Sequence, residues 1–161
     1  MSPFTTYFYQ FQVCGTNITG PIGRTKTAPA EDDEVSEIGL GVFSCANHPN
    51  GYFNAYGNIA RKDSVDYVVH LGDYIYEDEV GVPGEDERAM VPAKEIVTLY
   101  DYRRRFAQYR SDKDLRMAHE RYPFITVWVS NEAVLAATNV DERHRMTTKL
   151  RTITTATEAA P

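Results

Sequence analysis

The pattern of apolar and polar positions predicts an α/β unit in the middle of the chain. Short apolar runs without alternation occupy residues 38–44 and 67–71, which is typical of strands buried on both faces of a sheet. Apolar residues between the two runs recur at helical spacing: Tyr52, Phe53, Tyr56, Ile59 and Ala60. A strand, a helix and a second strand form a βαβ unit, so the pattern favours a parallel pair of strands.

Two more helices and a third strand are predicted after a loop-like acidic stretch at residues 81–92. Each helix is indicated by an apolar stripe, the first formed by Leu99, Tyr102, Phe106 and Tyr109 and the second by Leu115, Ala118 and Tyr122. Pro123 ends the second helix, because proline cannot continue it. The apolar run at residues 124–128 then predicts a third core strand.

The first thirty residues have a different character. Residues 5–13 are rich in β-forming side chains, and residues 21–27 follow a turn signal. Two strands alone are marginally stable in water, so we predict the last two strands of an immunoglobulin- or fibronectin-like β-sandwich. The predicted organisation has four parts: a β-sandwich remnant at 1–29, an acidic linker at 30–37, an α/β domain at 38–128 and a tail at 129–161 without a convincing period.

Composition and charge narrow the class of protein. The 161 residues are 42% apolar, which is enough for a core, and the net charge of −6 argues against nucleic-acid recognition and anionic membranes. The one dense basic cluster, at residues 103–105, is expected on a solvated helix face. No apolar run approaches the ~18 residues of a membrane span. No signal peptide follows Met1, and the two cysteines do not fix a redox compartment, so localisation and oligomeric state stay open.

Oxygen and sulfur donors follow two of the predicted strands. The second strand ends at Gly72, and Asp73 and Tyr76 come directly after it, while Cys45 ends the first strand one crossover away. Open α/β sheets keep their sites at this carboxyl edge. A carboxylate can bridge two cations, and a phenolate suits ferric iron. The plainer alternatives are a surface loop over a packed tyrosine, a buried free cysteine, and a core histidine at His70.

Three sequence motifs resemble landmarks of the PhoD-type alkaline phosphatases, a branch of the metallophosphoesterases. They are Gly-Tyr-Phe-Asn-Ala-Tyr at 51–56, His-Leu-Gly-Asp-Tyr-Ile-Tyr-Glu at 70–77 and Thr-Leu-Tyr-Asp-Tyr-Arg at 98–103. The resemblance covers residues 5–128. It implies a small β-sandwich followed by the metallophosphoesterase α/β sandwich, in a family whose members are typically secreted or held at the cell surface.

The same resemblance implies a site and a reaction. In the family, the residues that match Cys45, Asp73 and Tyr76 ligate ferric iron (Fe3+), and two calcium ions (Ca2+) complete the site. Arg88 matches a family arginine that would clamp phosphate with two parallel hydrogen bonds, against the plainer alternative of a solvated loop arginine. The implied function is the metal-dependent hydrolysis of small-molecule phosphate monoesters or diesters.

The sequence departs from the family after Trp128. The family continues there with Asp-Asp-His-Glu-Val and an asparagine that ligates calcium, whereas this chain continues with Val-Ser-Asn-Glu. The genetic code permits an intron start in the Val129-Ser130 codons and an intron end in His144-Arg145. A shifted frame from Arg145 onward permits the missing family residues. We therefore expect a tail of translated intron followed by frame-shifted exon, and we expect it to be disordered.

This departure changes the functional expectation. Half of the family's metal ligands are absent from the sequence as written, so we expect low or no phosphatase activity from it. Two alternatives from other classes stay open. One is a non-catalytic module that binds metal or phosphate through the remaining half-site, and the other is a non-functional product of mis-splicing.

Overall fold

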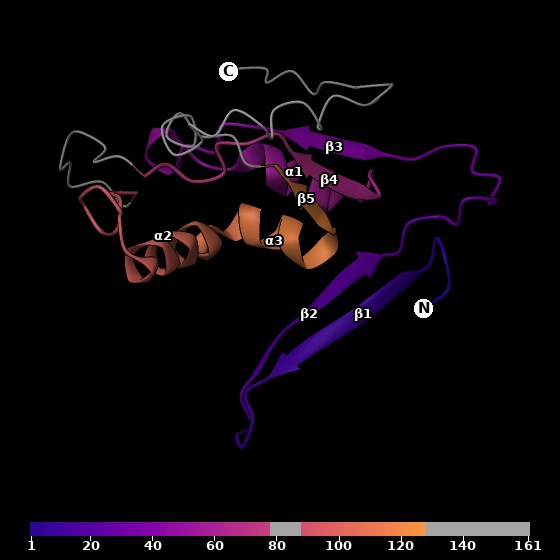
Figure 1. Cartoon of the computed structure of the whole chain (residues 1–161), viewed down its shortest axis with the longest axis horizontal. Helices are drawn as coiled ribbons and strands as arrows, with labels where there is room; N and C mark the ends of the chain where they lie inside the picture. Colours follow the sequence, from indigo (N-terminus) through magenta and orange to yellow (C-terminus); the bar gives the residue numbers. More distant parts are fainter. Residues whose placement is uncertain (78–87, 128–161) are drawn as a thin grey trace, which may run out of the picture.

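The computed structural model describes residues 1–77 and 88–127 (Figure 1). Two strands, β1 (Thr6–Gln12) and β2 (Thr19–Lys26), form an antiparallel hairpin. The remaining described elements form an α/β unit. They follow in the order β3 (Leu40–Phe43), the 3-10 turn η1 (His48–Asn50), α1 (Asn54–Lys62), β4 (Tyr67–His70), α2 (Leu99–Ser111), α3 (Lys113–Arg121) and β5 (Phe124–Thr126).

The sheet of the α/β unit is parallel, with the strand order β3-β4-β5. Phe43 pairs with His70, and His70 pairs with Thr126, so the three strands end at the same edge. Helix α1 connects β3 to β4, and helices α2 and α3 lead on to β5. The predicted α/β class is confirmed. Trp128 and the tail at 129–161 lie outside the described residues.

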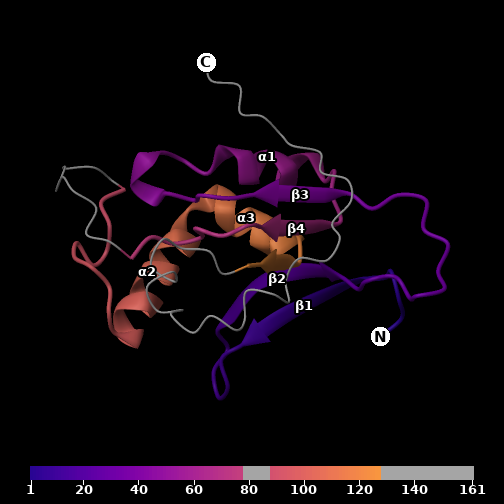
Figure 2. The same cartoon turned by 45° about the horizontal axis from the view of Figure 1, so that its top comes forward.

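The core of the unit lies around α1 and α3, which pack against each other alongside the sheet (Figure 2). Val68 on β4, Ala60 on α1, and Leu115 and Ala118 on α3 are fully buried. Burial of a leucine side chain stabilises a fold by about 1.5–3 kcal/mol, so these contacts hold the helices to the sheet. Within residues 1–77 and 88–127, no helix is long and apolar enough to cross a membrane.

Helix α2 forms where the apolar stripe predicts it, but of that stripe only Tyr109 is fully buried. Leu99 and Phe106, two members of that stripe, are 66% and 42% exposed. The buried line of the helix is Asp101, Arg105 and Tyr109. These residues are four positions apart and therefore share one face. The predicted helix is confirmed, and the predicted inward position of Leu99 and Phe106 is wrong.

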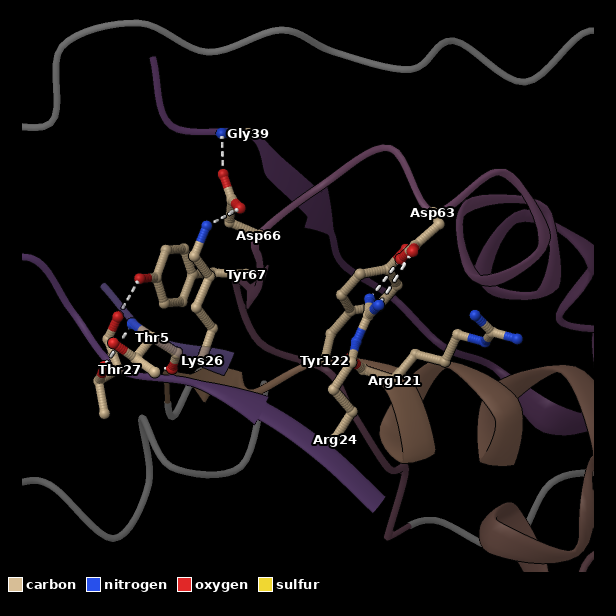
Figure 3. Close-up of polar contacts among 10 residues, drawn as sticks. All are labelled: Thr5, Arg24, Lys26, Thr27, Gly39, Asp63, Asp66, Tyr67, Arg121 and Tyr122. Atoms are coloured by element: carbon tan, nitrogen blue, oxygen red, sulfur yellow. Dashed lines mark hydrogen bonds and ion pairs between the residues drawn. The ribbon is translucent and has the colours of Figure 1, made fainter. Parts of the chain in front are cut away.

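Ion pairs attach the hairpin to the α/β unit (Figure 3). Arg24 on β2 pairs with the Asp63 carboxylate through two nitrogens, and its Nε donates to the Arg121 carbonyl at 3.0 Å. Lys26 Nζ lies 2.6 Å from Asp66 Oδ1. Asp63 follows α1 and Asp66 precedes β4, so both acids belong to the crossover that ends at the central strand. The hairpin is thereby held beside α3 and the sheet.

We expect Arg24→Gln to loosen the hairpin without unfolding the α/β unit. The hydrogen bond from Arg24 is the main cause that lowers the pKa of Asp63, which shows that the charged pair is favoured. Partly exposed pairs of this kind contribute about 0.2–1 kcal/mol, which corresponds to exchange up to about fivefold faster for β1 and β2 amides. Hydrogen–deuterium exchange measures this. The control Arg116→Gln removes an exposed pair within α3 and should leave hairpin exchange unchanged; equal exchange in both variants would contradict the expectation.

Candidate metal centre

Two loops meet at the edge of the sheet where β3 and β4 end. Cys45 lies just beyond β3, and Asp73 lies just beyond β4. The Cys45 N–H donates to the Gly72 carbonyl at 3.2 Å, and the Ala46 N–H donates to the Asp73 carbonyl at 2.9 Å. These bonds continue the contact between the two chain segments past the last paired residues of the sheet. These backbone hydrogen bonds therefore hold the two loops next to each other.

The backbone at both loops adopts the left-handed conformation. The φ angle is 57° at Cys45 and 51° at Asp73. A residue other than glycine held in this region costs about 1–3 kcal/mol, although aspartate tolerates it better than most. In this arrangement Cys45 Sγ lies 3.5 Å from Asp73 Oδ2 and donates to it. Cys45 is exposed and Asp73 is half-buried, so solvent reaches the pair.

Tyr76 completes a group of three side chains. It is half-buried, and its hydroxyl group lies close enough to the Cys45 side chain to interact with it. Burial, followed by the interactions with the Cys45 and Asp73 side chains, raises the pKa of the Tyr76 hydroxyl. A bound cation would act in the opposite direction, because a phenol must lose its proton to become a ligand. The structure thus brings together Cys45, Asp73 and Tyr76, the three candidate ligands.

Arg88, the candidate phosphate ligand, lies elsewhere. Its Nη1 pairs with Asp112 Oδ2 at 2.7 Å, and its Nε donates to the His48 carbonyl at 2.7 Å. The guanidinium also lies over the rings of Tyr52 and Phe53, at 4.8 and 5.0 Å from their centroids. It forms part of the wall of a cavity of about 520 Å³ near the start of α3. Cys45, Asp73 and Tyr76 do not line that cavity.

The family profile of the PhoD-like phosphatases matches residues 40–145 of this chain. The chain belongs to the PhoD-like phosphatase family. Alkaline phosphatase D of Bacillus subtilis strain 168 is 40% identical over 135 residues, which cover 82% of this chain and 22% of that protein. A solved structure of PhoD has a TM-score of 0.69 and 39% identity, and the match covers 81% of this chain and 25% of that one.

The chain spans about a quarter or less of the length of these PhoD-like relatives. The match therefore shows the family of this chain, and the activity of the complete relatives is a separate question. The family profile extends to residue 145, past Trp128, where the resemblance described above ends. That last stretch lies outside the described residues.

Membership of a metallophosphatase family suggests metal dependence, and the donor set fits a ferric ion. Thiolate, carboxylate and phenolate are three anionic donors, and iron in proteins is held by cysteine and tyrosine as well as by oxygen ligands. In residues 1–77 and 88–127, no three His, Cys, Asp or Glu side chains converge. The group of three exists only because a tyrosine supplies one member. An oxygen-rich calcium site of about six to eight ligands is not assembled by the described part of the chain.

A buried arginine behind this candidate site was missed by the sequence analysis. Arg105 has no exposed surface. It donates to the carbonyl oxygens of Tyr76, Pro92, Lys94 and Val91. The expectation that residues 103–105 form a solvated face is therefore wrong for Arg105, and it holds for its two exposed neighbours. Arg105 lies four positions after Asp101 and four positions before Tyr109. This spacing of polar residues along one helix face is the only sequence signal that would have found it.

Two histidines contact the segment that follows β4. His70 is buried, accepts from the Gly72 N–H at 3.4 Å through Nδ1, and lies 3.0 Å from the Tyr56 hydroxyl through Nε2. His119 Nε2 lies 2.8 Å from the Tyr74 hydroxyl. Burial lowers the pKa of His70 to about 4 and that of His119 to about 3. The expectation of a core histidine with hydrogen-bond partners at His70 agrees with the structure.

We expect both imidazoles to stay neutral at pH values where an ordinary histidine is charged. Their folded-state pKa lies below the unfolded value of about 6.5, so the unfolded chain takes up protons first as the pH falls. The free energy of unfolding should be greatest above about pH 6.5 and should decrease toward pH 4. NMR titration of the ring nitrogens of His70 and His119 measures the pKa directly. Titration of either ring near 6.5 would contradict this, and His119→Gln should flatten the pH dependence of stability.

Proposed function

We propose that this chain carries the iron-binding half of a PhoD-type phosphatase site. In this proposal Cys45, Asp73 and Tyr76 hold one ferric ion, and the complete site hydrolyses small-molecule phosphate monoesters or diesters. The observation that carries the proposal is the convergence of the three side chains at one edge of a parallel sheet. The 3.5 Å approach of Cys45 Sγ to Asp73 Oδ2, with the Tyr76 hydroxyl beside the Cys45 side chain, is the core of that observation.

The residues present would contribute charge, geometry and access. Three deprotonated side chains carry three negative charges, which match the charge of a ferric ion without a counter-ion from elsewhere. Asp73 has a second carboxylate oxygen with which to reach a neighbouring cation. The exposed position of Cys45 leaves the edge open to a phosphate ester. Metal ions held there would supply positive charge for the phosphate oxygens and Lewis-acid activation of water.

Calcium would need donors from outside the described residues. The two calcium ions of the proposed complete site require many oxygen ligands, and several cations cannot be held close together by Asp73 alone against their mutual repulsion. The family residues that would supply those oxygens do not follow Trp128 in this sequence. We therefore propose that the sequence as written binds iron at most, and that turnover requires the remaining ligands.

The hairpin fits the proposed β-sandwich module. Large apolar side chains of the hairpin are left exposed: Phe8, Phe11, Val13, Ile18 and Ile22. Phe8 on β1 and Ile22 on β2 lie on the same side of the hairpin, because Phe8 pairs with Arg24 and Gln10 pairs with Ile22. In a β-sandwich, each sheet buries one such apolar side against the second sheet. We propose that these strands belong to a sandwich in the complete PhoD-like protein, held to the α/β domain by the Arg24 and Lys26 ion pairs.

A second candidate function is the non-catalytic binding of phosphate, and Arg88 is the observation that favours it. Arg88 Nη2 is buried and has no hydrogen-bond partner among the described residues. The cavity that Arg88 lines also contains Arg61 and Lys113, next to Asp112 and Asp114. In this alternative, phosphate would bind the chain in the absence of iron. Arg88→Lys should then weaken phosphate binding, whereas the ferric site would be unaffected.

Visible absorption spectroscopy tests the ferric site. The purified chain with added Fe3+ should develop visible tyrosinate-to-iron charge-transfer absorption, and Tyr76→Phe should abolish it because the phenolate is the chromophore. Tyr100→Phe is the matched control, since Tyr100 is 68% exposed on α2. Cys45→Ser should weaken iron binding by at least about tenfold, with the exposed Cys14→Ser as its control. Retention of the band in Tyr76→Phe would remove Tyr76 from the site.

Activity is tested with p-nitrophenyl phosphate and bis(p-nitrophenyl) phosphate, in the presence of Fe3+ and Ca2+. We expect no turnover above background from the 161 residues, and turnover from a coding sequence in which the proposed intron after Trp128 is removed. The same interpretation requires that the genomic codons contain GT at Val129 and AG within Arg145, which transcript sequencing checks. Metal-dependent hydrolysis by the chain as written, purified free of host phosphatases, would refute the proposal of an incomplete site.

A further inference from the structure

The inward face of α2 holds the backbone of Tyr76. We propose that Arg105 is a positioning residue that fixes Tyr76 for cation binding at the Cys45–Asp73 edge. The inference rests on the ferric site proposed above and adds to it a residue that is not itself a ligand. Arg105 lies on the same buried line of α2 as Asp101 and Tyr109.

The guanidinium of Arg105 joins two segments that are distant in sequence. Its Nη1 donates to the Tyr76 carbonyl, and its Nη2 donates to the carbonyls of Pro92 at 2.7 Å and Lys94 at 3.2 Å. Its Nε donates to the Val91 carbonyl at 3.4 Å. Four hydrogen bonds thus use most of the five N–H donors of the side chain. The carbonyl after the candidate phenolate ligand is thereby tied to the segment that leads into α2.

The neighbouring contacts fix the same part of the backbone. The Ile96 N–H donates to the Glu77 carbonyl at 2.9 Å, so the peptide groups on both sides of Glu77 are held. The Tyr109 hydroxyl, one turn beyond Arg105, also interacts with the backbone of Tyr76. With both ends of the residue restrained, the direction of the Tyr76 side chain toward Cys45 is set by α2 and not by the loop alone.

Helix α2 also reaches the other ligand loop. The Tyr109 hydroxyl accepts from the His48 N–H at 3.3 Å, and His48 is three residues beyond Cys45. The start of the helix is fixed by a capping box, in which Thr98 and Asp101 bond each other's backbone N–H groups. A capped helix with two inward side chains therefore spans both loops that carry the candidate ligands. This is the arrangement expected of residues that orient metal ligands from behind.

The chemistry of the guanidinium makes the position sensitive to a conservative change. Arg105 makes no ion pair within residues 1–77 and 88–127, so its buried charge is compensated in direct contact by carbonyl dipoles. A lysine keeps the charge but offers three donors around one nitrogen, which cannot reach four carbonyls arranged around a planar fork. Arg105→Lys therefore removes the positioning contacts while leaving the charge in place.

The test compares Arg105→Lys with Arg104→Lys in the 161-residue chain. Arg104 is the exposed neighbour, so its variant controls for the loss of a guanidinium on α2. We expect Arg105→Lys to retain its helical circular dichroism, to lower Fe3+ affinity by about 10–100-fold, and to shift or weaken the charge-transfer band at saturating iron. Arg104→Lys should match the wild type. Wild-type affinity and an unchanged band in folded Arg105→Lys would overturn the inference.

Failure of the ferric site itself gives a different result. If Tyr76→Phe keeps the band, the proposed site is wrong, whereas loss of the band in Tyr76→Phe with an unchanged Arg105→Lys rejects only the role of Arg105. If Arg105→Lys does not fold, a measurement on the unaltered chain still tests the inference. Ga3+, a diamagnetic trivalent ion, should shift the Nε–H NMR signal of Arg105 and leave that of Arg104 in place. The absence of a shift at Arg105 on saturation with Ga3+ would overturn the inference as well.

Discussion

The parallel pairing of β3 with β4 is the constraint on which the candidate site depends. Because Phe43 and His70 are paired, the segments that follow them leave the sheet side by side. Cys45 and Asp73 are 28 positions apart in the chain, yet their loops exchange backbone hydrogen bonds as soon as the strands end. Helix α1 makes this possible, since a parallel pair needs a crossover that returns the chain to the starting edge. The closeness of the two candidate ligands is therefore a direct result of strand register.

The elements of the α/β unit are largely readable from the sequence, because they follow from apolar periodicity. Residues 38–44 and 67–71 have the unbroken apolar character of strands covered on both sides, and the structure places β3 and β4 there. The meeting of Cys45 with Asp73 also follows, since the carboxyl ends of neighbouring parallel strands coincide. Tyr76 is expected nearby as well, because it follows Asp73 by only three residues. These inferences need only local pattern and topology.

Helix α2 shows where that kind of inference ends. Its inward line is polar because two mostly irregular segments, around Tyr76 and before Thr98, present carbonyl oxygens that need donors. A buried guanidinium satisfies several of them at once, and a leucine at the same place would satisfy none. Apolar periodicity cannot detect such a face, which is why it wrongly predicts an inward position for Leu99 and Phe106. The burial of Arg88 cannot be predicted from the sequence for a related reason. Its partners, Asp112 and the His48 carbonyl, are brought near only by tertiary packing.

The left-handed backbone at Cys45 bears on how this chain could change over evolutionary time. A glycine at that position would adopt φ 57° without steric strain, and the fold would gain stability from the exchange. The loop would then keep its path and its hydrogen bond to Gly72 while losing its sulfur. Selection for stability alone thus points away from cysteine here, and selection for a metal ligand points toward it. In a relative that has lost activity, we expect Cys45 to be among the first residues to be replaced.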